Sequence, residues 1–171
     1  MKTIRYSLML LFIGFCGIIT AQEFEVPKQV KLEQPEDYAQ YKSAVLAGIA
    51  WLENTPVQND EVKRKETSAF LMKYMSGAPD FSIAIMPFQM NLVETNPELL
   101  MSFLGGWTRF ALENTGQKDN ALMANKAGIQ SLLKVYEINR GNGMKKDKKI
   151  EKLLKMEDAA LEKWIVAGLG R

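Results

Sequence analysis

Apolar side chains, most of them large, recur at helical spacing between residues 97 and 114, and this stripe constrains the fold more than any other feature of the chain. Its members are Leu99, Leu100, Phe103, Leu104, Trp107, Phe110 and Ala111. Because the apolar face is so broad, we expect this segment to be the central, most buried helix. Gly105 and Gly106 lie in its middle, where each costs about 1 kcal/mol relative to alanine. Close approach of another helix or strand would offset that cost.

Helical periodicity continues along the rest of the chain. The spacing of apolar residues predicts four more helices, over 35–54, 60–76, 119–139 and 145–167. Asn59 or Asp60 is a suitable cap for the second of these segments, and Asp119 for the 119–139 segment. We therefore predict a mainly α protein, with one helical domain of about five helices over 35–171.

The start of the central helix carries two alternative capping signals. Thr95 and Glu98 have the spacing of a capping box. Asn96, directly before Pro97, would serve as a cap instead. Either arrangement predicts that the helix begins close to residue 97.

Two segments alternate apolar with polar residues, as strands do. One is 22–34, which Pro27 interrupts, so we interpret it as an extended arm laid against the domain. The other is 81–86, directly before Pro87. Pairing of 23–32 with 81–86 would give a short two-stranded ribbon, whereas a short helix is the alternative for 78–93. The sequence leaves strand, helix and loop open for that segment.

The N-terminus has the pattern of a removable signal peptide. Lys2 and Arg5 precede an uncharged apolar run over 8–19, and Ala21 is a small residue at the expected cleavage point. The run is shorter than the roughly 20 residues that span a membrane. We predict that residues 1–21 are removed, as in exported bacterial proteins, and that the protein is periplasmic or secreted. An uncleaved anchor, or lipid attachment at Cys16, is the less favoured alternative.

Removal of residues 1–21 changes the charge balance. That segment carries two of the 22 positive residues and none of the 20 negative ones, so the remaining chain has 20 of each. A chain with no net charge has no long-range field that attracts polyanions. We therefore expect no nucleic-acid partner. Because the apolar run over 8–19 leaves with the signal peptide, we also expect no transmembrane segment after processing.

The processed chain also lacks the side chains on which many active sites depend. It has no histidine, and its only cysteine, Cys16, leaves with the signal peptide. Ser-His-Asp and Cys-His nucleophile systems are excluded, as are the usual zinc, copper and haem sites. The sequence contains neither an EF-hand loop nor a phosphate-binding glycine loop. We expect no cofactor and no metal, and we favour a non-enzymatic role.

Six lysines gather near the C-terminus, at positions 145, 146, 148, 149, 152 and 155. Acidic residues interleave with them, and Glu151 stands four residues before Lys155, a spacing that favours ion pairs on a helix. We interpret the run as a solvated helix face. An anionic lipid or polymer surface is the alternative partner.

The best candidate for a binding surface is the apolar, proline-broken segment 78–93 together with the central tryptophan. The residues concerned are Phe81, Ile83, Ile85, Met86, Phe88, Met90 and Trp107. They favour an exported binding or accessory protein whose partner is another protein or a small apolar ligand. The alternatives are a carrier of a small apolar ligand and a carboxylate-dependent hydrolase of cell-wall or glycan material. No sequence feature brings two particular carboxylates together.

Overall fold

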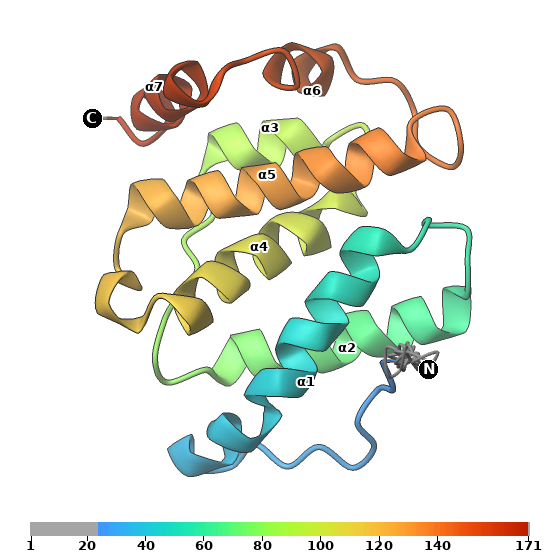
Figure 1. The fold of residues 1–171 in the computed structure, drawn as a ribbon, viewed down its shortest axis with the longest axis vertical. Coiled ribbons are helices and arrows are strands. Elements are labelled where there is room, and N and C mark those ends of the chain that lie inside the picture. Colours follow the sequence, from blue (N-terminus) through green and yellow to red (C-terminus); the bar gives the residue numbers. More distant parts are fainter. Residues whose placement is uncertain (1–23, 171) are drawn as a thin grey trace, which may run out of the picture.

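The computed structural model describes residues 24–170, and this part of the chain is mainly helical and contains no strands (Figure 1). The helices are α1 (Pro35–Asn54), α2 (Glu61–Gly77), α3 (Pro87–Val93), α4 (Leu99–Glu113), a 3₁₀ turn η1 (Thr115–Gln117), α5 (Ala121–Asn139), α6 (Lys148–Leu153) and α7 (Asp158–Gly168). The mainly helical fold is confirmed. The expected signal peptide lies outside the described residues.

Helices α4 and α5 form the centre of the molecule. As Figure 1 shows, α1 and α2 lie on one side of this pair, and α6 and α7 lie along the opposite side of α5. The two glycines of α4 face different neighbours. A Cβ atom on Gly106 would stand only 2.4 Å from the carbonyl oxygen of Ala127 in α5, whereas one on Gly105 would meet Ile49 of α1 at 3.3 Å. The expected close approach to α4 is therefore confirmed.

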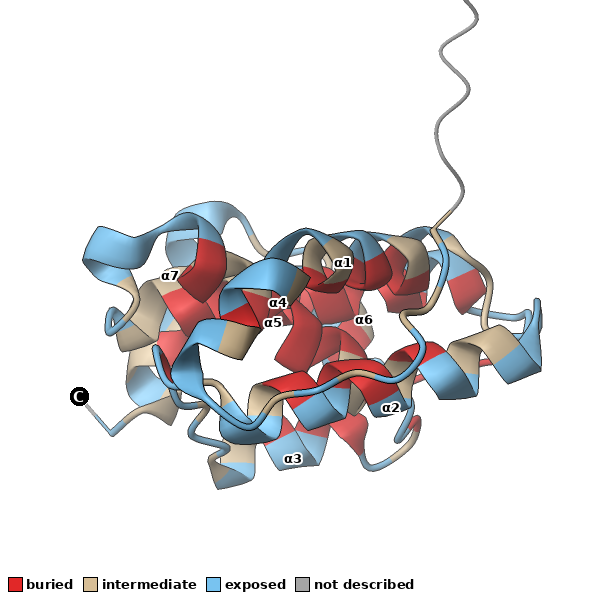
Figure 2. Cartoon of the chain, turned by 90° about the horizontal axis from the view of Figure 1, so that it is seen from below, coloured by how far each residue is buried: buried red, intermediate tan, exposed pale blue. Residues whose placement is uncertain are grey.

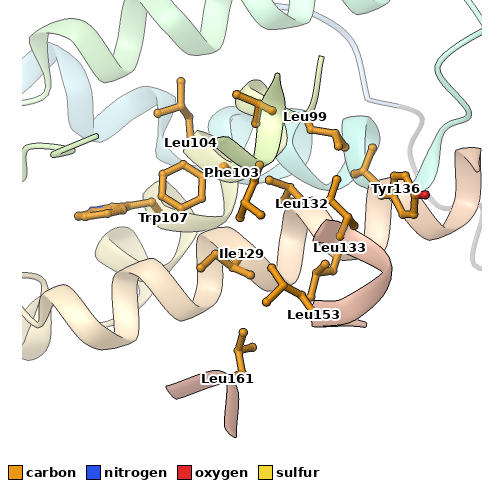
Figure 3. Packing of buried hydrophobic residues seen from close by; sticks show 14 of the residues in the cluster. Leu99, Phe103, Leu104, Trp107, Ile129, Leu132, Leu133, Tyr136, Leu153 and Leu161 are labelled. Atoms are coloured by element: carbon orange, nitrogen blue, oxygen red, sulfur yellow. The ribbon is translucent and has the colours of Figure 1, made fainter. Parts of the chain in front are cut away.

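Buried apolar residues form two clusters, one on each side of α4. The first cluster joins α4 and α5 to α3, α6 and α7, and Figure 3 shows part of it, with the Phe103 ring edge-on to Trp107. The second fills the space between α1, α2 and the end of α4. Figure 2 shows buried residues on the inner sides of α1 and α2 and exposed residues on their outer sides. Since α4 contributes to both clusters, its prediction as the central helix is confirmed.

The predicted ribbon between 23–32 and 81–86 is wrong, because neither segment forms a strand within residues 24–170. Side chains hold the arm in place instead. Lys73 Nζ donates to the Val30 carbonyl at 2.5 Å, and the Lys31 N–H donates to the Tyr41 hydroxyl at 3.3 Å. The 81–86 segment is a loop, and Pro87 then begins the short helix α3. The helix alternative for 78–93 is thus correct for its second half.

The last predicted helix, 145–167, is two helices in the structure, separated by a break at 154–157. The spacing of its apolar residues explains the break. Leu153, Glu157 and Leu161 stand four residues apart, so a continuous helix would place the Glu157 carboxylate on the buried face. With the break, both leucines are buried and Glu157 is exposed.

The expected capping box at the start of α4 is also wrong. The helix begins at Leu99, and Glu98 makes no side-chain cap. Asn96 is buried and binds a segment 49 residues away. Its Oδ1 accepts from the Lys145 N–H at 2.8 Å, and its Nδ2 donates to the Lys145 carbonyl at 2.9 Å. This pair of bonds fixes the chain between α5 and α6. The cap of α5 is Asn120 rather than the expected Asp119.

Candidate functional site

The seven residues predicted as a binding surface do not form one surface. Phe81 and Trp107 are buried in different apolar clusters, and Ile83 packs against both. Phe88 lies edge-on to Trp164 of α7, with ring centroids 5.3 Å apart. These four side chains therefore belong to the packed interior or its edge.

The other three predicted residues lie in and beside α3. Met86 precedes the helix, and its N–H donates to the Gln89 side chain. Ile85 and Met90 are the members that reach solvent, with exposed fractions of 43% and 45%. Two scattered apolar side chains are ordinary for a protein surface and do not by themselves make a recognition patch.

A hollow lies apart from these seven residues, between α2 and the start of α4. Its volume of about 620 Å³ is within the range of small-molecule sites. Apolar side chains from four parts of the fold line it: Leu52, Val57, Met101 and Val135. Polar and charged side chains complete the lining: Gln58, Glu61, Arg64, Lys65, Ser68, Glu98 and Ser102. We refer to this hollow as the α2–α4 groove.

Arg64 places a half-buried positive charge at the groove. Its Nη2 donates to the carbonyl oxygens of Thr55 and Pro56, at 2.6 and 3.0 Å, and its guanidinium carbon lies 5.4 Å from the centre of the Trp51 ring. Its Nε has no hydrogen-bond partner. Within residues 24–170 no carboxylate forms an ion pair with Arg64, and burial lowers the pKa of its guanidinium. The groove therefore contains a half-buried guanidinium that is not ion-paired with any carboxylate of residues 24–170.

The other cation of the groove is already paired. Lys65 Nζ lies 2.7 Å from Glu61 Oε1, four residues earlier on α2, and both side chains are exposed. An exposed pair of this kind contributes little energy and leaves little net charge. Arg64 is thus the group that is best placed to attract an anion into the groove.

The two buried carboxylates of the described chain are used elsewhere. Glu53 of α1 accepts from Arg109 of α4 at 2.7 Å and from the Ser131 hydroxyl of α5 at 2.6 Å, with Lys134 at 3.6 Å. Burial alone would raise the pKa of Glu53. The hydrogen bonds from Arg109 and Ser131, together with the charges of Arg109 and Lys134, outweigh burial and leave the pKa below its ordinary value. Glu53 is therefore an ionised link between three helices.

Asp147 has an equally defined role as the cap of α6. Its Oδ1 accepts from the backbone N–H groups of Lys149, at 2.7 Å, and Ile150, at 3.4 Å. Burial acts to raise its pKa, but hydrogen bonds from Thr95 and from the helix backbone lower the pKa overall. Neither Asp147 nor Glu53 lines the groove, and neither has the raised pKa of a general acid.

The described part of the chain lacks a metal cluster and a membrane-spanning helix. Between residues 24 and 170, no cluster of three or more acidic side chains could hold a metal ion. None of the helices there is long and apolar enough to cross a bilayer. Comparisons of the chain with protein-family models, with curated proteins and with solved structures found no match. The function must therefore be inferred from the residues of the site.

Sequence reasoning missed the groove because its lining comes from segments far apart in the chain. One signal pointed to it. The full chain has 17 lysines but only five arginines, and three of these, Arg64, Arg109 and Arg140, lie between residues 24 and 170. Arginine has a planar, weakly hydrated head that suits half-buried charge positions. In the structure Arg64 and Arg109 occupy such positions, whereas Arg140 is exposed.

Proposed function

We propose that this protein is an exported, non-enzymatic binding protein whose α2–α4 groove holds a small amphipathic ligand with an anionic group. The observation that carries the proposal is the half-buried Arg64 without a carboxylate partner, at a groove whose other lining includes apolar side chains. A carboxylate ligand would supply the missing counter-charge and accept charge-assisted hydrogen bonds. Carboxylate is the simplest ligand group with this chemistry.

The apolar lining supports an acyl or similar hydrocarbon part of the ligand. Leu52, Val57 and Met101 come from α1, the following loop and α4. Methionine is adaptable in shape and accommodates varied apolar groups. The groove is open to solvent, so it supports a binding protein for an amphipathic molecule better than a carrier that encloses a wholly apolar one.

The hydrolase alternative has less support. Glycoside hydrolysis requires two carboxyl groups flanking one cleft, one of which has a raised pKa. Glu53 and Asp147 both have lowered pKa values and both serve in packing. Two carboxylates line the groove, Glu61 and Glu98, and Glu61 is paired with Lys65.

Calorimetric titration of residues 22–171 with decanoate, decanol and decyltrimethylammonium tests the proposal. We expect decanoate to bind more tightly than the neutral and cationic chains of equal length. Arg64→Gln should weaken decanoate binding at least tenfold, because one charged hydrogen bond contributes about 1.5–3 kcal/mol. Lys65→Gln is the matched control and should change the affinity less than twofold.

A second variant tests whether a loss of binding in Arg64→Gln results only from a change in the folded structure. Ser68→Phe introduces a ring at the groove lining while keeping Arg64, and it should also reduce decanoate binding. Equal affinity for all three chains, or decanoate binding unchanged in both Arg64→Gln and Ser68→Phe, would refute the proposal.

A further inference from the structure

The lysine run of the C-terminal region is exposed, as a solvated helix face requires. The sequence also suggested ion pairs between these lysines and the acidic residues that interleave with them. In the structure, Asp147 is buried as the cap of α6. Glu151 turns away to Tyr136, whose hydroxyl donates to it at 3.0 Å, and to Arg140 at 3.4 Å.

The acidic residues of α7 are also engaged elsewhere. Lys126 of α5 forms ion pairs with Asp158 and with Glu162, the second at 2.7 Å. Within residues 24–170, Lys149 is the one member of the run with an acidic partner, Glu94 at 2.7 Å. The remaining five lysines, at 145, 146, 148, 152 and 155, form no ion pair there. The expected i, i+4 pair of Glu151 with Lys155 is absent.

Lys148, Lys149 and Lys152 share one side of α6 by helical spacing, and Lys145, Lys146 and Lys155 flank this helix. All six are exposed, whereas Ile150 and Leu153 of α6 point into the core. We call the six lysines the α6 lysine face. Since residues 22–171 have no net charge, a local excess of positive charge here is balanced by negative charge elsewhere. Such a charge distribution orients a molecule on a negatively charged plane even when the net charge is zero.

An aromatic hollow lies directly beside the α6 lysine face. It has a volume of about 270 Å³ between α3 and the C-terminal helices, and Phe88, Leu92 and Trp164 line it together with Lys149 and Lys152. Lys149 also contacts the Asn91 carbonyl, so α3 and α6 meet at this edge. Lysines with a neighbouring tryptophan are the side chains that favour the boundary between lipid headgroups and acyl chains.

We propose that the α6 lysine face and this hollow dock the protein on an anionic phospholipid bilayer. Lysine heads act as point charges, which suits a diffuse layer of headgroups better than bidentate recognition of individual phosphates. The apolar hollow adds a feature that a purely electrostatic polyanion site does not need. This inference is independent of the α2–α4 groove, because the groove is lined by residues of α1, α2, α4 and α5, whereas the hollow lies between α3, α6 and α7.

Vesicle co-sedimentation of residues 22–171 tests the inference. Vesicles of phosphatidylcholine with 30% phosphatidylglycerol should bind the protein, and pure phosphatidylcholine should not. Each lysine near an anionic surface strengthens binding about fivefold. The triple variant Lys148→Gln, Lys152→Gln, Lys155→Gln should therefore lose about 100-fold in partitioning.

The matched control removes three exposed lysines elsewhere, by Lys28→Gln, Lys31→Gln and Lys42→Gln, with the same change in net charge. It should retain binding within about threefold, and Arg64→Gln should retain it fully. Equal binding to neutral vesicles, equal losses in the two triple variants, or binding to heparin without binding to the anionic vesicles would overturn the inference.

Discussion

Gly106 and Gly128 face each other where α4 packs against α5, and a Cβ atom on Gly106 would stand 2.9 Å from the Cα of Gly128. A Cβ on Gly128 would in turn meet the Phe103 ring at 2.7 Å. The distance between the two central helices thus depends on the absence of side chains at both positions. Since α4 contributes to both apolar clusters, this contact determines the packing of the whole domain.

Gly106→Ala should destabilise the protein by about 3 kcal/mol, because its new methyl group would collide with the α5 backbone. Gly105→Ala is the matched control. Its methyl would meet only the Ile49 side chain, at 3.3 Å, while alanine gains about 1 kcal/mol in helix propensity. Its stability should stay within about 1 kcal/mol of the wild type. Urea unfolding followed by circular dichroism measures both, and equal losses would contradict this view of the helix contact.

Glu53→Gln should destabilise the protein by about 2 kcal/mol at pH 7, because it leaves Arg109 without its charge partner. The pKa of Glu53 is lowered in the folded state, so its contribution is complete above the ordinary glutamate pKa of about 4.3 and is lost as the pH falls through the lower folded value. The difference from wild type should shrink between about pH 4 and pH 2.

Urea unfolding at a series of pH values measures this dependence. Glu66→Gln, at an exposed site on α2, is the control and should have little effect on stability at pH 7. A Glu53→Gln difference that grows with acidification would show that the carboxylate is not held ionised by its partners.

Asn96→Ala should cost about 2–3 kcal/mol, because it leaves the backbone N–H and carbonyl of Lys145 without partners. Glu98→Ala discriminates between this clamp and the capping box that the sequence suggested. Glu98 is exposed and makes no cap, so its replacement should change stability by less than about 0.5 kcal/mol. Thermal unfolding of both variants provides the comparison, and a larger loss for Glu98→Ala would favour the capping box.

Lys126→Met should loosen α7, because it removes the ion pairs that join α5 to Asp158 and Glu162. Amides of α7 should exchange with deuterium at least tenfold faster, while those in the middle of α4 keep their rates. Lys163→Met, at an exposed position on α7, is the control and should leave exchange unchanged. Uniformly faster exchange throughout the chain would indicate global destabilisation instead.

Local sequence signals predicted much of the helical framework. The bounds of α1 match the predicted 35–54, because Pro35 and the acidic first turn act locally. The break between α6 and α7 was also within reach of the sequence, since Glu157 interrupts the apolar spacing of Leu153 and Leu161. The clamp of Asn96 on Lys145 was not, because it joins residues 49 positions apart.

For the candidate site, too, local sequence signals did not reveal contacts between distant parts of the chain. Segment 78–93 looked like a surface because it is apolar, yet its largest side chains complete the core. The α2–α4 groove combines short stretches from six parts of the fold, and none of these stretches is distinctive alone. Arg64 becomes informative only when its burial and its lack of a carboxylate partner are known.

The most direct test of the central claim, that the α2–α4 groove is the ligand site, is titration of ¹⁵N-labelled residues 22–171 with decanoate, followed by amide chemical shifts. We predict saturable shifts concentrated in 57–68 and 98–102, and their loss in Arg64→Gln. Shifts that saturate at 85–94 or elsewhere, with 57–68 and 98–102 unmoved, would contradict the account.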